Sequence, residues 1–173
     1  MKLAKSLDRL GTETAFSVLA EAKKLEAKGK PMIHLGLGQP DFKTPKHIVD
    51  AAKKALDDGH HGYVLSNGIL ECRQAVTRKI KKLYNQDIDP ERIIIMPGGK
   101  PTMSYAIQCF GEPGVEIVHP TPAFPIYESM INFTGAKPVP YDLTEDKDLK
   151  FNPGKILSLI TEKTKLLLSL IHI

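Results

Sequence analysis

The chain has 173 residues, of which 42% are hydrophobic and 25% are charged, and its formal net charge is +4. This length and composition are those of a globular chain with a core, which excludes the disordered class. Acidic residues interrupt the basic ones, as between Glu21 and Lys28, so solvated helix faces explain the positive charge better than a nucleic-acid surface does. We therefore expect no nucleic acid among the partners.

Neither a membrane segment nor a leader peptide is visible in the sequence. No apolar stretch reaches the roughly 20 residues of a membrane-spanning helix, and residues 1–30 have no apolar region of the kind that a secretory signal has. Cys72 and Cys109 have neither CxxC nor metal-ligand spacing, which is typical of structural thiols in a reducing compartment. These features predict a cytoplasmic protein without a membrane partner.

Helical and extended patterns alternate along the first half of the chain. Apolar residues recur every three to four positions over residues 15–25, which predicts a helix that ends near Gly29. A short strand is predicted at residues 32–35, before a segment rich in Gly and Pro. Thr44 and Pro45 are typical of a helix start. Further helices are predicted at 48–56 and 69–83, with a loop at 60–63 between them.

The second half repeats this alternation with stronger strand signals. Residues 93–96, Ile-Ile-Ile-Met, form an apolar run typical of a strand buried on both faces. Other strands are predicted at 115–118, 137–141 and 166–168, and helices at 103–110, 126–133 and 156–160. This alternation predicts an α/β fold with a mostly parallel sheet and flanking helices. Ligands of such sheets bind beyond the carboxyl ends of the strands, which points to the segment after Leu35 and to the turns at 98–100 and 119–124.

The turn Gly98-Gly99-Lys100 follows a predicted buried strand and opens a predicted helix. Consecutive amides at a helix N-terminus attract anions, and glycine lets a phosphate approach the backbone closely. A tight turn that binds nothing is the alternative, and the tripeptide alone favours it. A Walker A loop does not fit, because Ile94 stands where its first glycine belongs and Pro101 where its Ser or Thr belongs. The dinucleotide fingerprint fails too, since Asp41 replaces the third glycine after Gly36-x-Gly38.

Three other features carry little information when each is taken alone. His60-His61 has no third ligand at a recognisable spacing, so a solvated loop is a better interpretation than a metal site, and no metal is expected. Tyr63 can be explained by loop packing. Phe124, between Pro122 and Pro125, can be explained as a core aromatic residue.

Taken together and in order, these segments resemble the class I/II pyridoxal-phosphate-dependent aminotransferases of the aspartate aminotransferase type. The resemblance rests on five motifs: Leu37-Gly38-Gln39-Pro40-Asp41-Phe42-x-Thr44-Pro45-x-His47-Ile48; Tyr63 with Gly68-Ile69-x-Glu71-x-Arg73; Pro97-Gly98-Gly99-Lys100; Glu112-Pro113-Gly114-Val115-Glu116-Ile117; and Pro120-x-Pro122-x-Phe124-Pro125-x-Tyr127. Cys72 occupies a place where the family usually has leucine. The resemblance extends from about Phe16 to Leu167.

The resemblance implies a role for each of five positions. Backbone amides of Gly99 and Lys100 would hold the phosphate of pyridoxal 5'-phosphate, and Phe124 would stack on its pyridine ring, where Trp or Tyr is common. Gly38 would lie against the substrate carboxylate, because a residue without a side chain permits close approach. Tyr63 would reach the phosphate in the partner subunit, which implies a homodimer with shared active sites.

The resemblance also implies a PLP-transferase-type fold with an incomplete sheet. Residues 1–43 would form an N-terminal arm and part of the small domain, and residues 44–167 the N-terminal part of the large PLP-binding domain. Residues 168–173, Leu-Ser-Leu-Ile-His-Ile, resemble the translation of a transposon end used in sequencing libraries, so we expect a non-native tail. An ordinary apolar C-terminal strand is the alternative.

The reacting groups of the family are expected beyond this sequence. Its cofactor-binding lysine, its pyridine-nitrogen carboxylate and its substrate-binding arginine follow an Asn-Pro-x-x-Pro-x-Gly loop, which would come after the strand at Leu166. The sequence is therefore expected to be an N-terminal fragment cut before the catalytic lysine, and no catalytic residue is assigned within it.

The parent protein is expected to be a transaminase (EC 2.6.1.-) that moves an amino group between an L-amino acid and a 2-oxo acid, as part of amino-acid metabolism. Aspartate is the leading donor, because the look-alikes have that specificity. A PLP-dependent lyase of the same fold is one alternative. For the 173 residues alone, a catalytically inactive fragment that at most binds cofactor is the better prediction.

Overall fold

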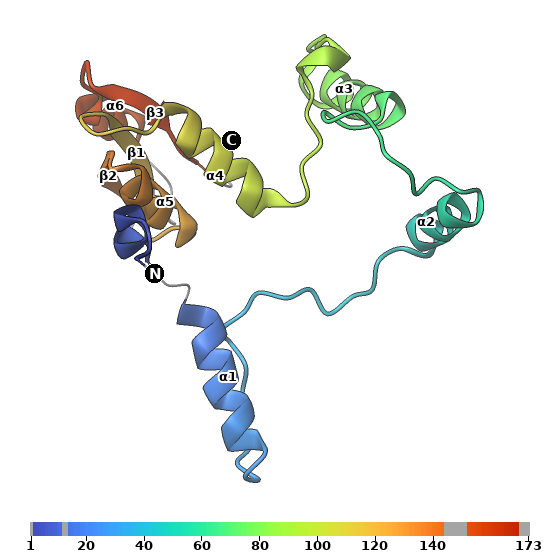
Figure 1. The fold of residues 1–173 in the computed structure, drawn as a ribbon, viewed down its shortest axis with the longest axis horizontal. Coiled ribbons are helices and arrows are strands. Elements are labelled where there is room, and N and C mark those ends of the chain that lie inside the picture. Colours follow the sequence, from blue (N-terminus) through green and yellow to red (C-terminus); the bar gives the residue numbers. More distant parts are fainter. Residues whose placement is uncertain (1, 12–13, 144–151, 170–173) are drawn as a thin grey trace. The chain divides into compact units, whose positions relative to one another are not determined.

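The structure is a computed structural model, and it describes residues 2–11, 14–143 and 152–169 (Figure 1). The chain forms two compact units, one from residues 1–36 and 98–173 and the other from residues 37–97. Each unit is treated by itself below. The predicted division of the chain at residues 43 and 44 stays a prediction, and the part of the predicted tail at 170–173 lies outside the described residues.

A parallel sheet forms the centre of the first unit. Its described strands are β1 (Glu116–Thr121), β2 (Lys137–Asp142) and β3 (Thr164–Leu167), in the order β2-β1-β3. Strand β1 pairs in register with β2 from Glu116 opposite Lys137 to Thr121 opposite Asp142, and its pairing with β3 has one irregularity between Glu116 and Ile117. The α/β fold with a parallel sheet, predicted from the alternation of strands and helices, is confirmed.

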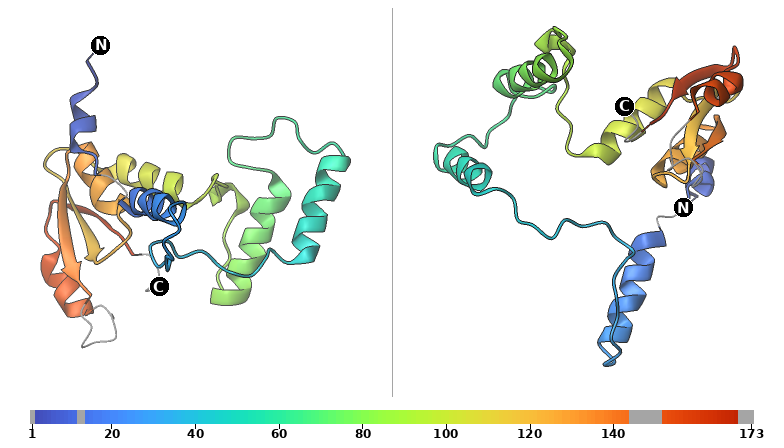
Figure 2. Two further views of the ribbon diagram at one scale, coloured as in Figure 1. Left: turned by 90° about the horizontal axis from the view of Figure 1, so that it is seen from below. Right: turned by 180° about the vertical axis from the view of Figure 1, so that it is seen from behind.

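Helices cover both faces of this sheet, as the left view of Figure 2 shows. Helices α4 (Gly99–Phe110) and α5 (Ile126–Thr134) lie on one face, and α6 (Pro153–Leu159) lies on the other. Alternate residues of a strand point to opposite faces. Accordingly Ile117 and Val118, both fully buried, belong to two different cores.

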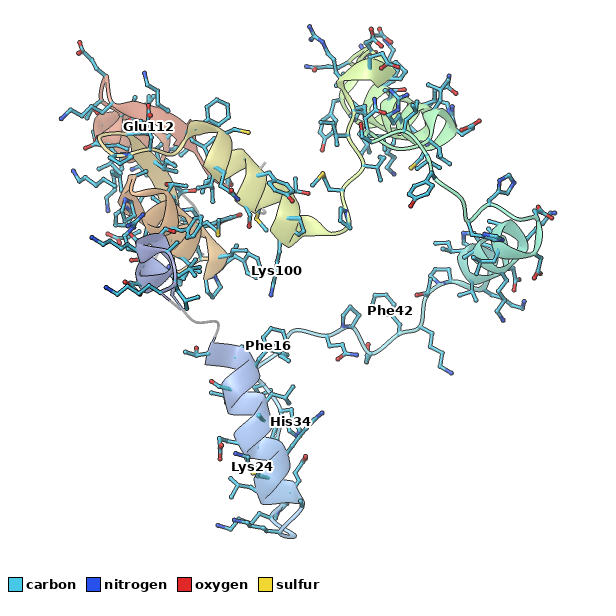
Figure 3. The ribbon with its side chains drawn as sticks, viewed as in Figure 1. Phe16, Lys24, His34, Phe42, Lys100 and Glu112 are labelled. Carbon is cyan, nitrogen blue, oxygen red and sulfur yellow. The ribbon has the colours of Figure 1, made fainter. Side chains whose placement is uncertain are left out.

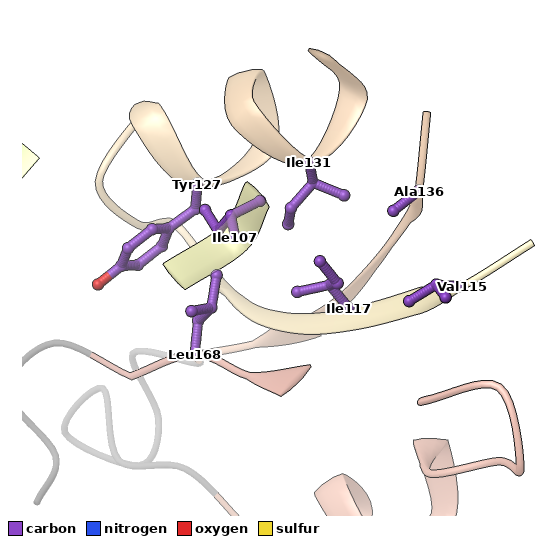
Figure 4. Close-up of a cluster of buried hydrophobic side chains, with 7 residues drawn as sticks. All are labelled: Ile107, Val115, Ile117, Tyr127, Ile131, Ala136 and Leu168. Atoms are coloured by element: carbon purple, nitrogen blue, oxygen red, sulfur yellow. The ribbon is translucent and has the colours of Figure 1, made fainter. Parts of the chain in front are cut away.

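The larger core lies between β1, α4 and α5 (Figure 4). Its buried members come from both helices, from β1 and from the residues next to β2 and β3: Ile107, Val115, Ile117, Tyr127, Ile131, Ala136 and Leu168. The second core, formed by Val118, Tyr141 and Ile156, lies between the sheet and α6. These two cores fix the ends of β1 and the start of α5, which together position the loop between them.

An N-terminal segment packs against α5. The 3-10 helix η1 (Lys5–Arg9) ends with Arg9, whose guanidinium donates to the carbonyls of Asn132 and Phe133 at 2.7 Å each. Carbonyls in the last turn of a helix lack intrahelical donors, so an arginine there acts as a C-terminal cap. The amide of Gly11 also donates to Ser129 Oγ at 3.0 Å. Helix α1 (Thr14–Glu26) follows and has no buried residue.

The second unit contains α2 (Lys46–Asp57), α3 (Leu70–Tyr84) and the 3-10 helix η2 (Pro90–Arg92). Arg73 of α3 is only 2% exposed. Its guanidinium donates to the carbonyls of Gly68 and Pro90 and forms an ion pair with Glu91 at 2.8 Å. These bonds satisfy the buried charge and connect the loop before α3 to the segment after it.

Two predicted strands are not strands in the structure. Residues 32–35 and 93–96 pair with none of the described strands. Ile94, expected in a core, is 64% exposed, and Ile95 is 37% exposed. A parallel strand needs a hydrogen-bonded neighbour, and an apolar sequence alone cannot supply one. Both strand predictions are therefore wrong for the part of the chain that the structure describes.

Candidate functional site

The candidate site lies at the carboxyl end of the sheet of the first unit. Strand β1 ends at Thr121, and the loop from Pro122 to Pro125, which begins with a cis peptide bond, leads into α5. Phe124 in this loop is partly buried and packs against the larger core. Its ring meets that of Tyr127 edge to face, with the ring centroids 6.3 Å apart and the planes at 88°. The core thus holds Phe124 in one place, as a stacking residue needs.

The turn before α4 places backbone amides at the start of a helix, beside open space. Gly98, at φ 103° and ψ 169°, is the N-cap residue and provides no side-chain cap for this end of the helix. The first amides of a helix have no intrahelical acceptor and carry the positive end of its dipole. A Cβ built on Gly98 would meet nothing within 4 Å. The first turn has no acidic residue, so both geometry and charge suit an anion.

The rest of this turn is consistent with an anion site built from backbone. Thr102 uses its hydroxyl to donate to the Gly98 carbonyl at 3.0 Å, which directs that carbonyl toward the helix. Pro101 has no N–H, so the donors of the turn are the amides next to it. Among the residues that the structure describes, the nearest neighbour of a Cβ at Gly99 would be Met103 Cε at 3.8 Å. Pyridoxal phosphate, with its phosphate and flat ring, fits such a turn beside an aromatic side chain.

The Lys100 side chain extends from this turn toward Phe124. The Lys100 ammonium lies 5.7 Å from the centroid of the Phe124 ring and 5.1 Å from that of Phe16 on α1 (Figure 3). Lys100 and Phe124, to which the family resemblance gives roles at one cofactor, thus lie near each other in the first unit, and Gly99 precedes Lys100 in the chain. The roles that we expect for them stay predictions.

Gly38 and Tyr63 belong to the second unit, so their position relative to this cluster is not described. Tyr63 is fully exposed and lines a groove of its own unit with Ala55, His60, Ile69 and Glu71, among others. A Cβ on Gly38 would meet nothing within 4 Å. Their predicted contacts with the phosphate of a partner and with the substrate remain predictions.

Sequence reasoning missed Phe16 as part of this cluster. Its place on an apolar helix face is typical of core packing, and no local pattern connects it to Lys100. Only the tertiary structure brings α1 to the start of α4. Tyr127 was part of an aromatic motif, and the structure adds that burial raises the pKa of its hydroxyl.

His119 is a second residue whose surroundings the sequence could not give. It is 4% exposed on β1, and its Nδ1 lies 3.0 Å from the Pro120 carbonyl. Its Nε2 is buried and has no hydrogen-bond partner among the residues that the structure describes. An unsatisfied buried polar atom normally destabilises a fold, so we expect His119 to lower the stability of the first unit.

An ion pair lies at the other end of β1, at Glu116. Glu116 accepts from Lys137 at 2.9 Å and from the Thr161 hydroxyl at 2.8 Å. These two hydrogen bonds lower the pKa of the Glu116 carboxyl. Because ligands bind at the carboxyl ends of parallel strands, this pair supports the sheet and takes no part in the site.

Within the described ranges, no cluster of His, Cys, Asp and Glu could hold a metal ion. In the same ranges, no helix has the length and apolar character that a membrane crossing requires. The thiols of Cys72 and Cys109 are both free.

Comparisons with known proteins agree on one family. The family model "Aminotransferase class I and II" matches residues 30–169. An aspartate aminotransferase of Bacillus subtilis (strain 168) is 36% identical over 165 residues, which cover 95% of this chain and 42% of the relative. A (5-formylfuran-3-yl)methyl phosphate transaminase of Methanocaldococcus jannaschii is 41% identical over 142 residues, which cover 82% of this chain and 38% of the relative.

A solved structure gives the same result for the fold. The aspartate aminotransferase from Thermus thermophilus with maleate matches with a TM-score of 0.89 at 29% identity, over 96% of this chain and 44% of that protein. The chain therefore spans less than half the length of the relatives that it matches.

Proposed function

This chain belongs to the class I and II aminotransferases, and we propose that the whole protein uses pyridoxal 5'-phosphate to transfer an amino group between an L-amino acid and a 2-oxo acid. The observation that carries this proposal is the cluster at the carboxyl end of β1. The turn of amides at the start of α4 carries Lys100, whose ammonium lies 5.7 Å from the ring centroid of the aromatic residue Phe124. A phosphate attached to a flat pyridine ring needs this combination.

Two parts of the chain would hold the cofactor. The amides of Gly99 and Lys100 would donate to its phosphate, assisted by the dipole of α4. The Phe124 side chain would cover one face of the pyridine ring and exclude water from it. When bound, the cofactor supplies the electron sink that removal of a substrate Cα proton requires. The chain's own residues bind, orient and shield, and none of its lysines is assigned to proton transfer.

The substrate and the partner subunit would involve the second unit. In this proposal Gly38 lies against the substrate carboxylate, and Tyr63 reaches the phosphate bound by the other copy of a homodimer. The full exposure of Tyr63 is compatible with such a contact. The cytoplasm, where amino-acid metabolism takes place, would be its compartment.

Aspartate is our leading amino donor. The relatives from Bacillus subtilis and Thermus thermophilus are named for it, whereas the one from Methanocaldococcus jannaschii is named for a furan phosphate. All three are named as transaminases, so we do not propose a lyase. The 173 residues by themselves are proposed to be inactive, because the catalytic lysine of the family has no counterpart assigned among them.

The test is a panel of L-amino acids offered to the protein expressed from its complete gene, with 2-oxoglutarate as acceptor. We expect glutamate to form, fastest from aspartate, and only when pyridoxal phosphate is present. A Phe124→Ala variant should lose most of this activity, and Phe124→Trp should keep it. Full activity of Phe124→Ala, or none of the wild type with any donor, would contradict the proposal.

A further inference from the structure

Lys100 lies within reach of two phenylalanine rings from distant segments of the chain. Its Nζ is 5.1 Å from the centroid of the Phe16 ring on α1 and 5.7 Å from that of Phe124 before α5. Both distances are within the roughly 6 Å over which a ring face attracts a cation. The transaminase proposal uses Phe124 and gives Phe16 no role.

Helix α1 is an unusual place for such a contact. None of its residues is buried, and Phe16 itself is 52% exposed. Helix α1 thus contributes no residue to the two cores of the described residues, although its Phe16 lies near the Lys100 ammonium. Figure 3 shows the two side chains directed toward one another from α1 and α4. The contact therefore concerns the surroundings of Lys100 more than the packing of the fold.

The ammonium of Lys100 is in a position that the helix dipole disfavours. Lys100 belongs to the first turn of α4, which has no acidic residue, and a cation is repelled by the positive end of a helix. Attractive contacts decide where such a side chain points. The ring faces of Phe16 and Phe124 both provide such an attraction.

We propose that Phe16 is a positioning residue: its ring holds the Lys100 ammonium near Phe124 at the mouth of the Gly98–Lys100 turn, so that the cation strengthens the binding of a phosphate monoester. The identity of this monoester as the cofactor rests on the proposed function. The contact between Phe16 and Lys100 does not. Two measurements separate the two statements.

The first measurement examines the contact in the whole protein without cofactor. Its lysines are reductively methylated with 13C, which keeps their charge, and the Lys100 methyl signal is identified as the one absent in Lys100→Met. We expect ring currents to displace this signal from that of solvated lysines. Phe16→Leu should move the Lys100 methyl signal back toward the position of solvated lysines. Phe16→Tyr, which keeps an aromatic ring, should leave the signal displaced. The matched control Val18→Ala on the same helix should leave it unchanged. An identical Lys100 signal in wild type and Phe16→Leu would overturn the proposal.

The second measurement gives the affinity of the same variants for pyridoxal phosphate and for inorganic phosphate. Phe16→Leu should weaken both by about 2- to 5-fold, the range of an exposed cation–π contact, and Phe16→Tyr should restore them. In a Lys100→Met background, Phe16→Leu should have no further effect. An equal loss in both backgrounds would mean that Phe16 only supports α1, which would overturn the proposal.

If the wild type binds neither ligand, the transaminase proposal and the phosphate-binding role of Phe16 both fail. The methyl signal would then still decide whether the contact exists. The two failures are therefore distinguishable.

Discussion

Gly98→Ala perturbs the turn before α4 without removing any side chain. Gly98 has φ 103° and ψ 169°, a region that only glycine occupies readily and in which other residues are strained by about 1–3 kcal/mol. A methyl group there would meet none of the described residues within 4 Å, so we expect the penalty to come from the backbone. We expect the variant to lose about 1–3 kcal/mol of unfolding free energy, or to relieve the strain by rotating the turn.

Either result should weaken the binding of pyridoxal phosphate, because the turn aims the amides of Gly99 and Lys100. Gly29→Ala is the matched control. Gly29 also has a positive φ, 78°, with nothing within 4 Å of a Cβ, but it lies at the far end of α1. The Gly29→Ala variant should lose about 1–2 kcal/mol of unfolding free energy and keep its affinity for pyridoxal phosphate.

Urea denaturation of the whole protein gives the stability of each variant, and an absorbance titration with pyridoxal phosphate gives its affinity. Wild-type stability together with wild-type affinity in Gly98→Ala would refute this reasoning. An equal loss of affinity in Gly29→Ala would refute it as well, because the effect would then not depend on the turn.

Three further changes test the supports of the fold. Replacing His119 by Ile removes a buried Nε2 that has no partner among the described residues. We expect the free energy of unfolding, measured by urea denaturation, to rise by about 1–3 kcal/mol. A decrease would mean that another part of the protein binds this nitrogen. Hydrogen bonds from Lys137 and Thr161 lower the pKa of the Glu116 carboxyl, so the contribution of this carboxylate to stability is complete above pH 4.5 and disappears as the pH falls through the lowered pKa. In Glu116→Gln, the free energy of unfolding should therefore fall less steeply on the acid side of a stability–pH curve. An unchanged curve would mean that Glu116 does not contribute to the acid destabilisation. Arg73→Met leaves the carbonyls of Gly68 and Pro90 without their donor and should lower the free energy of unfolding by about 1.5–3 kcal/mol. The control is Arg78→Met on the exposed side of α3, which should change the free energy of unfolding little.

Local sequence patterns predicted most elements of the first unit. The alternation of Ile117 and Val118 between two faces follows from the geometry of a strand, and the position of Phe124 beyond the end of β1 follows from the parallel fold. The turn at Gly98 and the start of a helix there were predictable because an apolar run, two glycines and a helical pattern follow one another in the sequence. Local chemistry determines each of these features.

Other features depend on contacts that no local pattern encodes. The run at residues 93–96 has the composition of a buried strand, but strand formation requires a neighbour, and the described residues supply none. Phe16 lies near Lys100 only because α1 meets the start of α4, and Arg9 caps α5 across most of the sequence. The family motifs chose Phe124 and Lys100, whereas the three-dimensional arrangement added Phe16.

A crystal structure of the whole protein with pyridoxal 5'-phosphate would test the central claim most directly. We predict that the phosphate oxygens accept hydrogen bonds from the amides of Gly99 and Lys100, and that the pyridine ring lies against Phe124. A phosphate bound elsewhere, with the turn before α4 closed or facing away from the ring, would contradict the account.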